Sequence, residues 1–240
     1  MIGIPIRRLV RRAGIDIEWR HTILFDLLER NHVDVVLDVG ANEGQFGRRL
    51  RAWGYRGRII SFEPLRDAFT VLERHAARDR RWEVHRMAVG AENGTAELNV
   101  AGATVFSSLL PPDPALEAVF PTATVQRTET VEVRTLDSMF ESLGIIGGRP
   151  FLKIDVQGFE HAVMQGAGRT LERVCGAQVE LTLTRLYLGE STMGEIIADF
   201  ERRGFVLSLI EPVAYNPASG ALLSLDAAFF RSPVAANGIA

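Results

Sequence analysis

Residues 35–44 read VVLDVGANEG, and this stretch decides the fold. Four apolar residues, interrupted only by Asp38, lead into a turn that begins at Gly40 and ends at Gly44. The residues from Gln45 to Trp53 then follow a helical pattern. A strand, a turn and a helix in this order bring backbone N–H groups and a helix N-terminus to the carboxyl end of a buried strand. The stretch therefore predicts an α/β domain with a ligand site at this turn.

The order of residues in the turn argues against a dinucleotide as the ligand. The dinucleotide fingerprint places its second glycine at the position of Asn42, and Glu43 would put a negative charge beside a pyrophosphate. A second apolar strand at 59–62 is followed by Glu63, and an acid about 20 residues beyond the turn is the usual partner of ribose hydroxyls. We therefore predict a ligand with an amino-acid end, a ribose and a base but no phosphates. S-adenosylmethionine fits this description.

The composition is that of one soluble domain. The chain has 240 residues, of which 47% are hydrophobic and 24% charged, so it can bury a sizeable core. A net charge of −3 does not indicate the basic surface that is typical of general nucleic-acid binding. The single cysteine, Cys175, excludes a disulfide framework and a cysteine-rich metal site. We expect a basic segment and a helix in residues 1–32, and a single domain in residues 33–240.

The hydropathy of the chain predicts a cytoplasmic protein. No apolar run reaches the ~18 residues of a membrane span, and residues 1–14 lack the ~7–15-residue apolar stretch of a signal peptide. Arg7, Arg8, Arg11 and Arg12 form a basic cluster that could make weak contact with an anionic membrane surface. The alternative is a solvated basic face, which we favour.

Strands and helices alternate beyond residue 33, which predicts a mostly parallel sheet with helices on both faces. The predicted strands are 35–39, 58–62, 82–87, 95–100, 130–134, 150–156, 177–183, 205–210 and 227–231, of which the last two could pair as an antiparallel edge. The predicted helices are 19–30, 45–53, 65–77, 136–143, 159–165 and 193–203. Residues 101–126 contain four prolines and little periodicity, so we expect a long loop that is either a substrate lid or a disordered insertion.

Candidate catalytic residues lie near the predicted carboxyl ends of two later strands. Lys153, the only lysine among 27 cationic residues, shares a strand face with Asp155. Asp155 is our first choice as the base or orienting group for a hydroxyl that accepts a methyl group, with Glu180, His161 and His85 behind it. Asp155 and Glu180 could instead hold a divalent cation that binds the acceptor oxygen, and the sequence leaves both alternatives open.

Several blocks of this chain resemble the FkbM-like class I S-adenosylmethionine-dependent methyltransferases. The matching blocks are VVLDVGANEGQF (35–46), SFEP (61–64), AVG…G (88–94), SSL (107–109), TLD (135–137), FLKIDVQGFE (151–160), VELTLTRLYLGE (179–190) and LLSLDAAFFR (222–231). The FLKIDVQGFE block is the most specific. The resemblance implies a Rossmann-like α/β fold, with a seven-stranded mostly parallel sheet and an antiparallel last strand. It also implies O-methylation of hydroxyls on sugars, glycolipids, polyketides or related secondary metabolites.

The resemblance also implies roles for single residues. The implied cofactor-binding residues are Asp38, Gly40, Asn42 and Gly44 at the methionine end, Glu63 at the ribose, and Met87, Ala88 and Val89 beside the adenine. Ser108 and Asp155 would lie where cofactor and acceptor meet. The implied partner is a small-molecule or glycolipid acceptor.

Two other functions stay open at this point. One is a nicotinamide-dependent oxidoreductase, although Asn42 in place of the middle glycine speaks against it. The other is a module that binds the methyl donor or a nucleotide without performing chemistry, because a fold does not determine a function.

Overall fold

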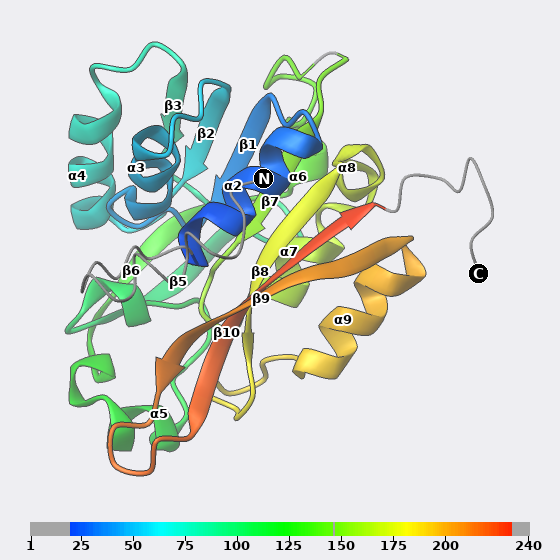
Figure 1. Ribbon diagram of the computed structural model, residues 1–240. Helices are drawn as coiled ribbons and strands as arrows, with labels where there is room; N and C mark the ends of the chain where they lie inside the picture. The colour runs from blue at the N-terminus through cyan, green and yellow to red at the C-terminus, as the bar shows by residue number, and fades with distance from the viewer. Residues whose placement is uncertain (1–19, 146, 232–240) are drawn as a thin grey trace, which may run out of the picture.

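A computed structural model of the chain describes residues 20–145 and 147–231, and its centre is a seven-stranded sheet (Figure 1). The strand order is β3-β2-β1-β7-β8-β10-β9. The strands are β1 (Val35–Val39), β2 (Arg58–Phe62), β3 (Trp82–His85), β7 (Pro150–Ile154), β8 (Gly176–Thr182), β9 (Phe205–Tyr215) and β10 (Leu222–Arg231). All five residues of β1 are buried, since β1 lies between β2 and β7 and is covered on both faces.

The directions of the strands confirm the predicted fold class. Strands β3, β2, β1, β7 and β8 pair in parallel, whereas β10 is antiparallel to both β8 and β9. The chain runs outward from β1 to β2 and β3, and later continues from β7 on the other side of β1. The order therefore reverses between β1 and β7, and ligands of such sheets bind beyond the carboxyl ends of the strands at this point.

Helices cover both faces of the sheet, as the alternation predicted (Figure 1). One face holds α2 (Arg20–Arg30), α3 (Gln45–Ala52) and α4 (Arg66–Ala76), whose apolar side chains pack with Val36 of β1. The other face holds α6 (Leu136–Met139), α7 (Glu160–Gln165), α8 (Gly168–Arg173) and α9 (Met193–Arg202), which pack with Val35 and Leu37. Neighbouring residues of β1 serve opposite layers because side chains alternate along a strand.

A second, three-stranded sheet was not predicted from the sequence. Its order is β4-β6-β5, with β4 (Ala88–Val89), β5 (Gly94–Ala101) and β6 (Val125–Arg134). The predicted strand 82–87 ends at His85, where the chain turns and joins this sheet as β4 instead. The apolar face of the three-stranded sheet packs against Leu65 and Ala68 near the start of α4. This packing explains why the two-residue strand β4 leaves the main sheet.

Residues 101–126 differ from the expected loop. They contain the 3-10 helix η1 (Thr104–Phe106), the helix α5 (Pro114–Val119), the 3-10 helix η2 (Pro121–Ala123) and the start of β6. Pro114 and Pro121 stand at the beginnings of α5 and η2, where a missing N–H costs no helical hydrogen bond. The Asp113 carboxylate caps α5 by accepting the Ala115 N–H at 2.9 Å. The prolines therefore begin short helices here.

The sequence patterns also missed α8 and the length of the β9–β10 hairpin. Pro212 interrupts the apolar pattern of β9, but an edge strand tolerates a residue without an N–H. None of the helices in the described residues is long and apolar enough to cross a membrane. The basic cluster of residues 7–12 lies outside the described residues.

Candidate active site

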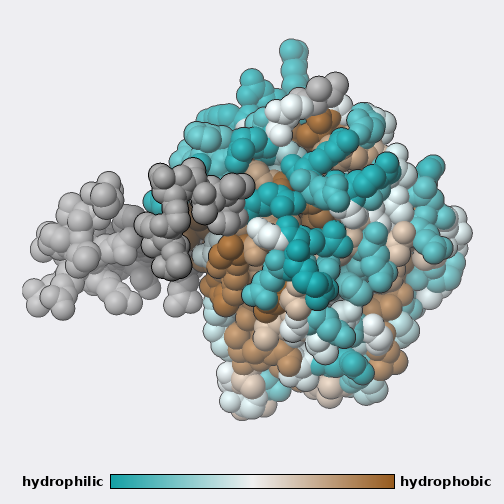
Figure 2. All heavy atoms as spheres, turned by 90° about the vertical axis from the view of Figure 1, so that its right-hand side faces the viewer, coloured by the Kyte–Doolittle hydropathy of each residue, from teal (hydrophilic) through white to brown (hydrophobic). Residues whose placement is uncertain are grey.

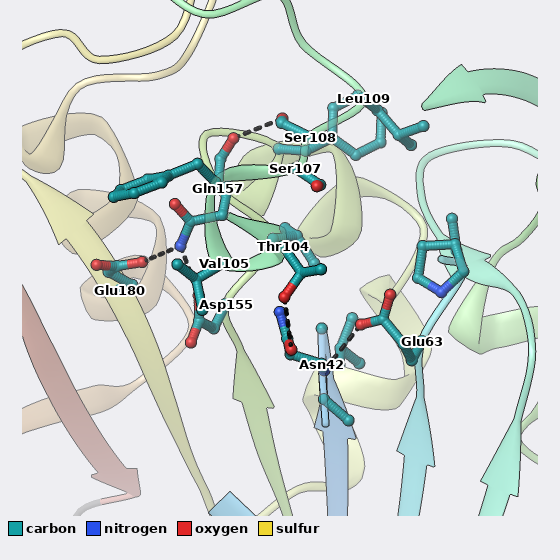
Figure 3. A pocket seen from close by; sticks show the side chains of 18 of the residues that line it. Asn42, Glu63, Thr104, Val105, Ser107, Ser108, Leu109, Asp155, Gln157 and Glu180 are labelled. Atoms are coloured by element: carbon teal, nitrogen blue, oxygen red, sulfur yellow. Dashed lines mark hydrogen bonds between the residues drawn. The ribbon is translucent and has the colours of Figure 1, made fainter. Parts of the chain in front are cut away.

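A cavity of about 430 Å³ opens at the carboxyl ends of β1, β2 and β7. Its wall combines the turn after β1, the residues after β2, the β4 region, the η1 loop and the turn after β7 (Figure 3). The sequence-predicted residues that line it are Gly40, Asn42, Glu63, Met87, Ala88, Val89, Ser108, Asp155 and Glu180. Segments more than 100 residues apart in the chain therefore meet in this cavity.

The turn after β1 makes close backbone contacts with the end of β2 and with the residues that follow β7. The N–H groups of Gly40 and Ala41 both donate to the Phe62 carbonyl at 3.0 Å. Gly40 has φ 77°, and a Cβ at this position would lie 1.8 Å from the backbone oxygen of Asp155. Only glycine fits here, because it accepts the positive φ and leaves room for the neighbouring backbone.

Gly44 begins α3 and packs closely on the core. It is the N-cap of α3 with φ 84°, and a Cβ there would meet Leu72 and Trp82 at 2.9 and 3.1 Å. Gly44 lies outside the described residues that line the cavity. The absence of a side chain at Gly44 therefore permits close packing of the turn on the core.

The Glu63 carboxylate organises the donor end of the cavity. Its two oxygens accept the backbone N–H groups of Asn42 and Leu65, both at 2.8 Å. Burial raises the pKa of Glu63 to about 7, although these two hydrogen bonds oppose the shift. Each carboxylate oxygen can accept a further hydrogen bond. Glu63 can therefore receive two neighbouring hydroxyls from the cavity side.

Met87, Ala88 and Val89 form an apolar part of the wall near Glu63. Ala88 and Val89 belong to β4 of the second sheet, and both are buried. This wall can give a flat aromatic group apolar contact close to a carboxylate that can accept hydrogen bonds from hydroxyls. His85 lies near this wall but outside the described lining residues, and its ring stacks on Phe62 with 5.3 Å between centroids.

The side-chain amide of Gln157 bridges Asp155 and Glu180. The sequence patterns assigned no role to Gln157. Gln157 Nε2 donates to Asp155 Oδ1 at 2.9 Å and to Glu180 Oε2 at 2.6 Å (Figure 3). Gln157 has φ 57°, and its Oε1 accepts the Tyr187 hydroxyl at 3.0 Å. The spacing of an acid and an amide two residues apart could have suggested this pair, but Glu180 and Tyr187 come from a different element.

The two carboxyl groups have opposite pKa shifts. Burial opposes ionisation of Asp155, but the Lys153 ammonium and the hydrogen bond from Gln157 outweigh it and lower the pKa. Burial raises the pKa of Glu180 well above its usual value, and the negative charge of Asp155 adds to this shift. The surroundings of the pair therefore favour the carboxylate form of Asp155 and the neutral form of Glu180.

Lys153 lines the cavity and lies between two acids. Its Nζ is 3.1 Å from Asp155 Oδ2, 3.5 Å from Asp38 Oδ1 and 5.5 Å from the centre of the Phe46 ring. Asp38 is fully buried, and its Oδ2 accepts the Ser61 hydroxyl at 3.1 Å. The structure thus places Asp38 behind the described cavity-lining residues, where it supports Lys153.

The described residues contain no group of three or more His, Cys, Asp or Glu side chains placed to hold a metal ion. Between Asp155 and Glu180, the Gln157 amide donates a hydrogen bond to each carboxyl group. A divalent cation at this pair would need further ligands from water or from the acceptor.

His161 and Ser108 have surroundings that the sequence did not indicate. His161 lies in α7, outside the described residues that line the cavity, so the structure does not bring this candidate base to Asp155. Ser108 is buried in the wall, and its hydroxyl donates to the Gln157 carbonyl at 2.6 Å. Thr104 Oγ1 donates to Asn42 Oδ1 at 3.3 Å. Ser108 and Thr104 therefore attach the η1 loop to both ends of the site.

Gly40→Ala tests the close approach of the two turns. We expect a loss of more than about 3 kcal/mol in unfolding free energy. The new methyl group would clash with the Asp155 backbone, and the positive φ would add a further cost. Gly220→Ala is the matched control, with φ 73° and nothing within 4 Å of its Cβ, and should lose about 1 kcal/mol. Urea unfolding measures both variants, and equal losses would contradict the steric role of Gly40.

Comparison with known proteins identifies the family. Residues 38–207 match the family described as the Methyltransferase FkbM domain, and no curated protein matches the chain. One similar solved structure is the Burkholderia thailandensis 1,6-didemethyltoxoflavin-N1-methyltransferase with bound 1,6-didemethyltoxoflavin and S-adenosylhomocysteine. It is 15% identical, the match covers 95% of this chain and 86% of that one, and the TM-score is 0.48.

A second similar structure is the magnesium protoporphyrin IX methyltransferase from Synechocystis PCC 6803 with bound S-adenosylmethionine. It is 9% identical, with 88% of this chain and 79% of that one covered and a TM-score of 0.45. The family match spans most of the 240 residues and includes the glycine turn, Glu63, Asp155 and Glu180. The chain therefore belongs to the FkbM methyltransferase family, and its methyl donor is S-adenosylmethionine.

Proposed function

We propose that this protein is an S-adenosylmethionine-dependent O-methyltransferase that acts on a hydroxyl of a sugar, a glycolipid or a related secondary metabolite. The observation that carries the proposal is the ionised, partly exposed Asp155 carboxylate in the same cavity as the Glu63 donor site. A carboxylate that stays unprotonated at neutral pH can accept a hydrogen bond from an acceptor hydroxyl and later its proton.

The residues at the donor end fit S-adenosylmethionine. The turn containing Gly40 and Asn42 would hold the methionine portion, Glu63 the ribose hydroxyls, and Met87 with Ala88 the adenine. When bound, the cofactor supplies a methyl group on a positively charged sulfur. Asp155 and the turn after β1 line the same cavity. The acceptor would approach the methyl group from this cavity.

The lowered pKa of Asp155 suits a late proton transfer. An alcohol is a much weaker acid than a carboxylic acid, so Asp155 cannot fully remove the proton before attack. Once the oxygen has begun to bond to the methyl group, it becomes strongly acidic, and Asp155 can then take the proton. Most of the rate enhancement would come from aligning the hydroxyl with the methyl group.

Gln157 and Glu180 help to keep the Asp155 carboxylate ionised. The raised pKa of Glu180 favours its neutral form, which adds no negative charge beside Asp155, and the Gln157 N–H group donates to Asp155. Lys153 donates to the other Asp155 oxygen. These three groups orient the carboxylate, so that its remaining lone pairs face the cavity.

Glu63→Ala tests the donor site. We expect the variant to bind S-adenosylmethionine at least about tenfold more weakly, because the hydrogen bonds to the ribose hydroxyls are lost. Isothermal titration calorimetry with the purified protein measures the affinity, and an unchanged dissociation constant would remove Glu63 from the site.

Donor binding should also depend on pH through Glu63. With a pKa of about 7, its acceptor form rises from about a tenth of the protein at pH 6 to about nine tenths at pH 8. We therefore expect binding to tighten by up to about tenfold over this range. Glu63→Gln carries no ionisable group at this position and should lose this dependence. A wild-type affinity that is the same at pH 6 and pH 8 would contradict the assignment.

Asp155→Asn tests the base. We expect kcat to fall by about 10²- to 10⁴-fold, because the amide cannot take the proton, while the affinity for the donor stays within about threefold of the wild type. Incubation with methyl-labelled donor and cell extract, followed by isolation of the labelled product, identifies the acceptor. Unchanged turnover would exclude Asp155 as the base, and donor binding without any methylated product would favour a non-catalytic module.

Gln157→Glu and Gln157→Ala separate the amide's hydrogen bonds from its size. At pH 8 a third carboxylate would face Asp155 and Glu180, so kcat should be lower in Gln157→Glu than in Gln157→Ala. Toward pH 6 the new carboxyl group takes up a proton and can donate again, so the difference should shrink. Turnover at both pH values checks this, and equal activities of the two variants at pH 8 would contradict the bridging role.

A further inference from the structure

The part of the cavity beyond the acid pair has an apolar wall. It is built by three segments that are distant in the chain: the η1–η2 region, the segment that follows β8, and the β9–β10 hairpin. The apolar residues that these segments contribute are Val105, Phe106, Leu116, Phe120, Leu186 and Val213. This set, which we term the apolar wall, is separate from the residues near Glu63 that would contact the adenine.

The apolar wall is packed and anchored. The rings of Phe106 and Phe120 stack with 5.3 Å between their centroids, and both pack against a buried cluster that includes Leu116 and Leu186. The Tyr187 hydroxyl donates to the Phe106 carbonyl at 3.1 Å. A wall with these contacts has a defined shape, as a binding site for an apolar group requires.

Two of the three hydroxyl groups near this wall already donate hydrogen bonds within the protein. Thr104 donates to Asn42, Ser107 accepts the Ala101 N–H at 3.2 Å, and Ser108 donates to the Gln157 carbonyl. A free sugar carries several hydroxyls, and each would lose its water on entering this part of the cavity. Unpaired polar groups are costly to bury, so the wall favours an apolar group over a second set of hydroxyls.

The apolar wall continues to the surface at the mouth of the cavity. Val105 is 47% exposed and Val213 is 50% exposed, although both line the cavity. Leu188 and Tyr215, from the same two segments as Leu186 and Val213, are also half-exposed. Figure 2 looks onto the β9 edge of the molecule and shows hydrophobic side chains gathered on one side of this face. An apolar group longer than the cavity could therefore leave it along an apolar path.

We propose that the apolar wall is an acceptor subsite that binds an alkyl, acyl or aromatic group attached close to the hydroxyl that is methylated. The inference rests on the proposed O-methyltransferase function and narrows its substrate class to amphipathic hydroxyl compounds. The hydroxyl would lie at Asp155, and the apolar group would lie between the Phe106–Phe120 pair and Val213.

Binding of simple glycosides tests the subsite without turnover. The protein is saturated with S-adenosylhomocysteine and titrated by calorimetry with methyl, hexyl and octyl β-D-glucopyranoside below their micelle concentrations. Each buried methylene strengthens binding by up to about fourfold, so even partial burial should make the octyl glycoside bind at least about tenfold more tightly than the methyl glycoside. Phenyl β-D-glucopyranoside shows whether an aromatic group is bound as well as an alkyl chain.

Val213→Asp and Val206→Asp form a matched pair for this test. Both valines lie in β9 and are 50% and 52% exposed, but only Val213 lies among the described cavity-lining residues. We expect Val213→Asp to weaken octyl glycoside binding at least about fivefold, because the new charge meets the apolar chain, whereas Val206→Asp should bind like the wild type. Binding of S-adenosylhomocysteine by both variants checks that they are folded.

Three outcomes would overturn the subsite. These are no binding of the octyl glycoside, no gain from methyl to octyl, and an equal gain in Val213→Asp and the wild type, which would mean non-specific surface binding. Failure of the wild-type protein to bind S-adenosylhomocysteine would instead overturn the proposed function. Normal S-adenosylhomocysteine binding with any of the three outcomes would overturn only the subsite.

Discussion

The contact between the backbones of Gly40 and Asp155 brings the two halves of the site together. The Asp155 N–H donates to the Val39 carbonyl at 3.0 Å, and the missing side chain of Gly40 leaves room for the Asp155 carbonyl. Because β1 and β7 are adjacent and parallel, the turns that follow them leave the sheet at the same edge. The glycine turn after β1 and the turn that bears Asp155 therefore line one cavity.

Charge burial below this contact explains why the chain's only lysine is at position 153. Burial disfavours the Lys153 ammonium, but the neighbouring carboxylates outweigh this effect and raise its pKa. The ammonium also lies 5.5 Å from the centre of the Phe46 ring, and it is a more compact group than a planar guanidinium. Removing one partner of such a buried set leaves an uncompensated charge, so Asp38 and Lys153 depend on each other. Asp38 is buried behind the residues that line the cavity, where its carboxyl group lies 3.5 Å from the Lys153 ammonium.

The cavity is divided by chemistry as well as by position. Its donor end presents the Glu63 carboxylate, its middle presents the Asp155–Gln157–Glu180 group, and its far end is apolar. The hydroxyls of Thr104 and Ser108 attach the η1 loop to Asn42 and Gln157, which lie on either side of the middle. The loop over residues 104–110 therefore closes the site and also supplies part of the surface that an acceptor would meet.

Local patterns in the sequence predicted most of the main sheet, and they singled out the turn after β1 and Glu63, which the structure brings to one cavity. The strand–turn–helix at 35–53 and the acid at Glu63 depend on short-range periodicity and spacing, which hold wherever the unit is placed. The separate sheet formed by β4, β5 and β6, the short helices of 104–123 and the position of Gly44 against Trp82 were decided by packing between distant segments. The same holds for the amide bridge, where Gln157 meets Glu180 and Tyr187 only because β7 and β8 are neighbours. The sequence by itself determined which chemical groups are available and on which strands they lie. Only the tertiary structure decided which of them face the cavity, because the distances and burial that set their hydrogen bonds and pKa values arise from contacts that no local pattern encodes.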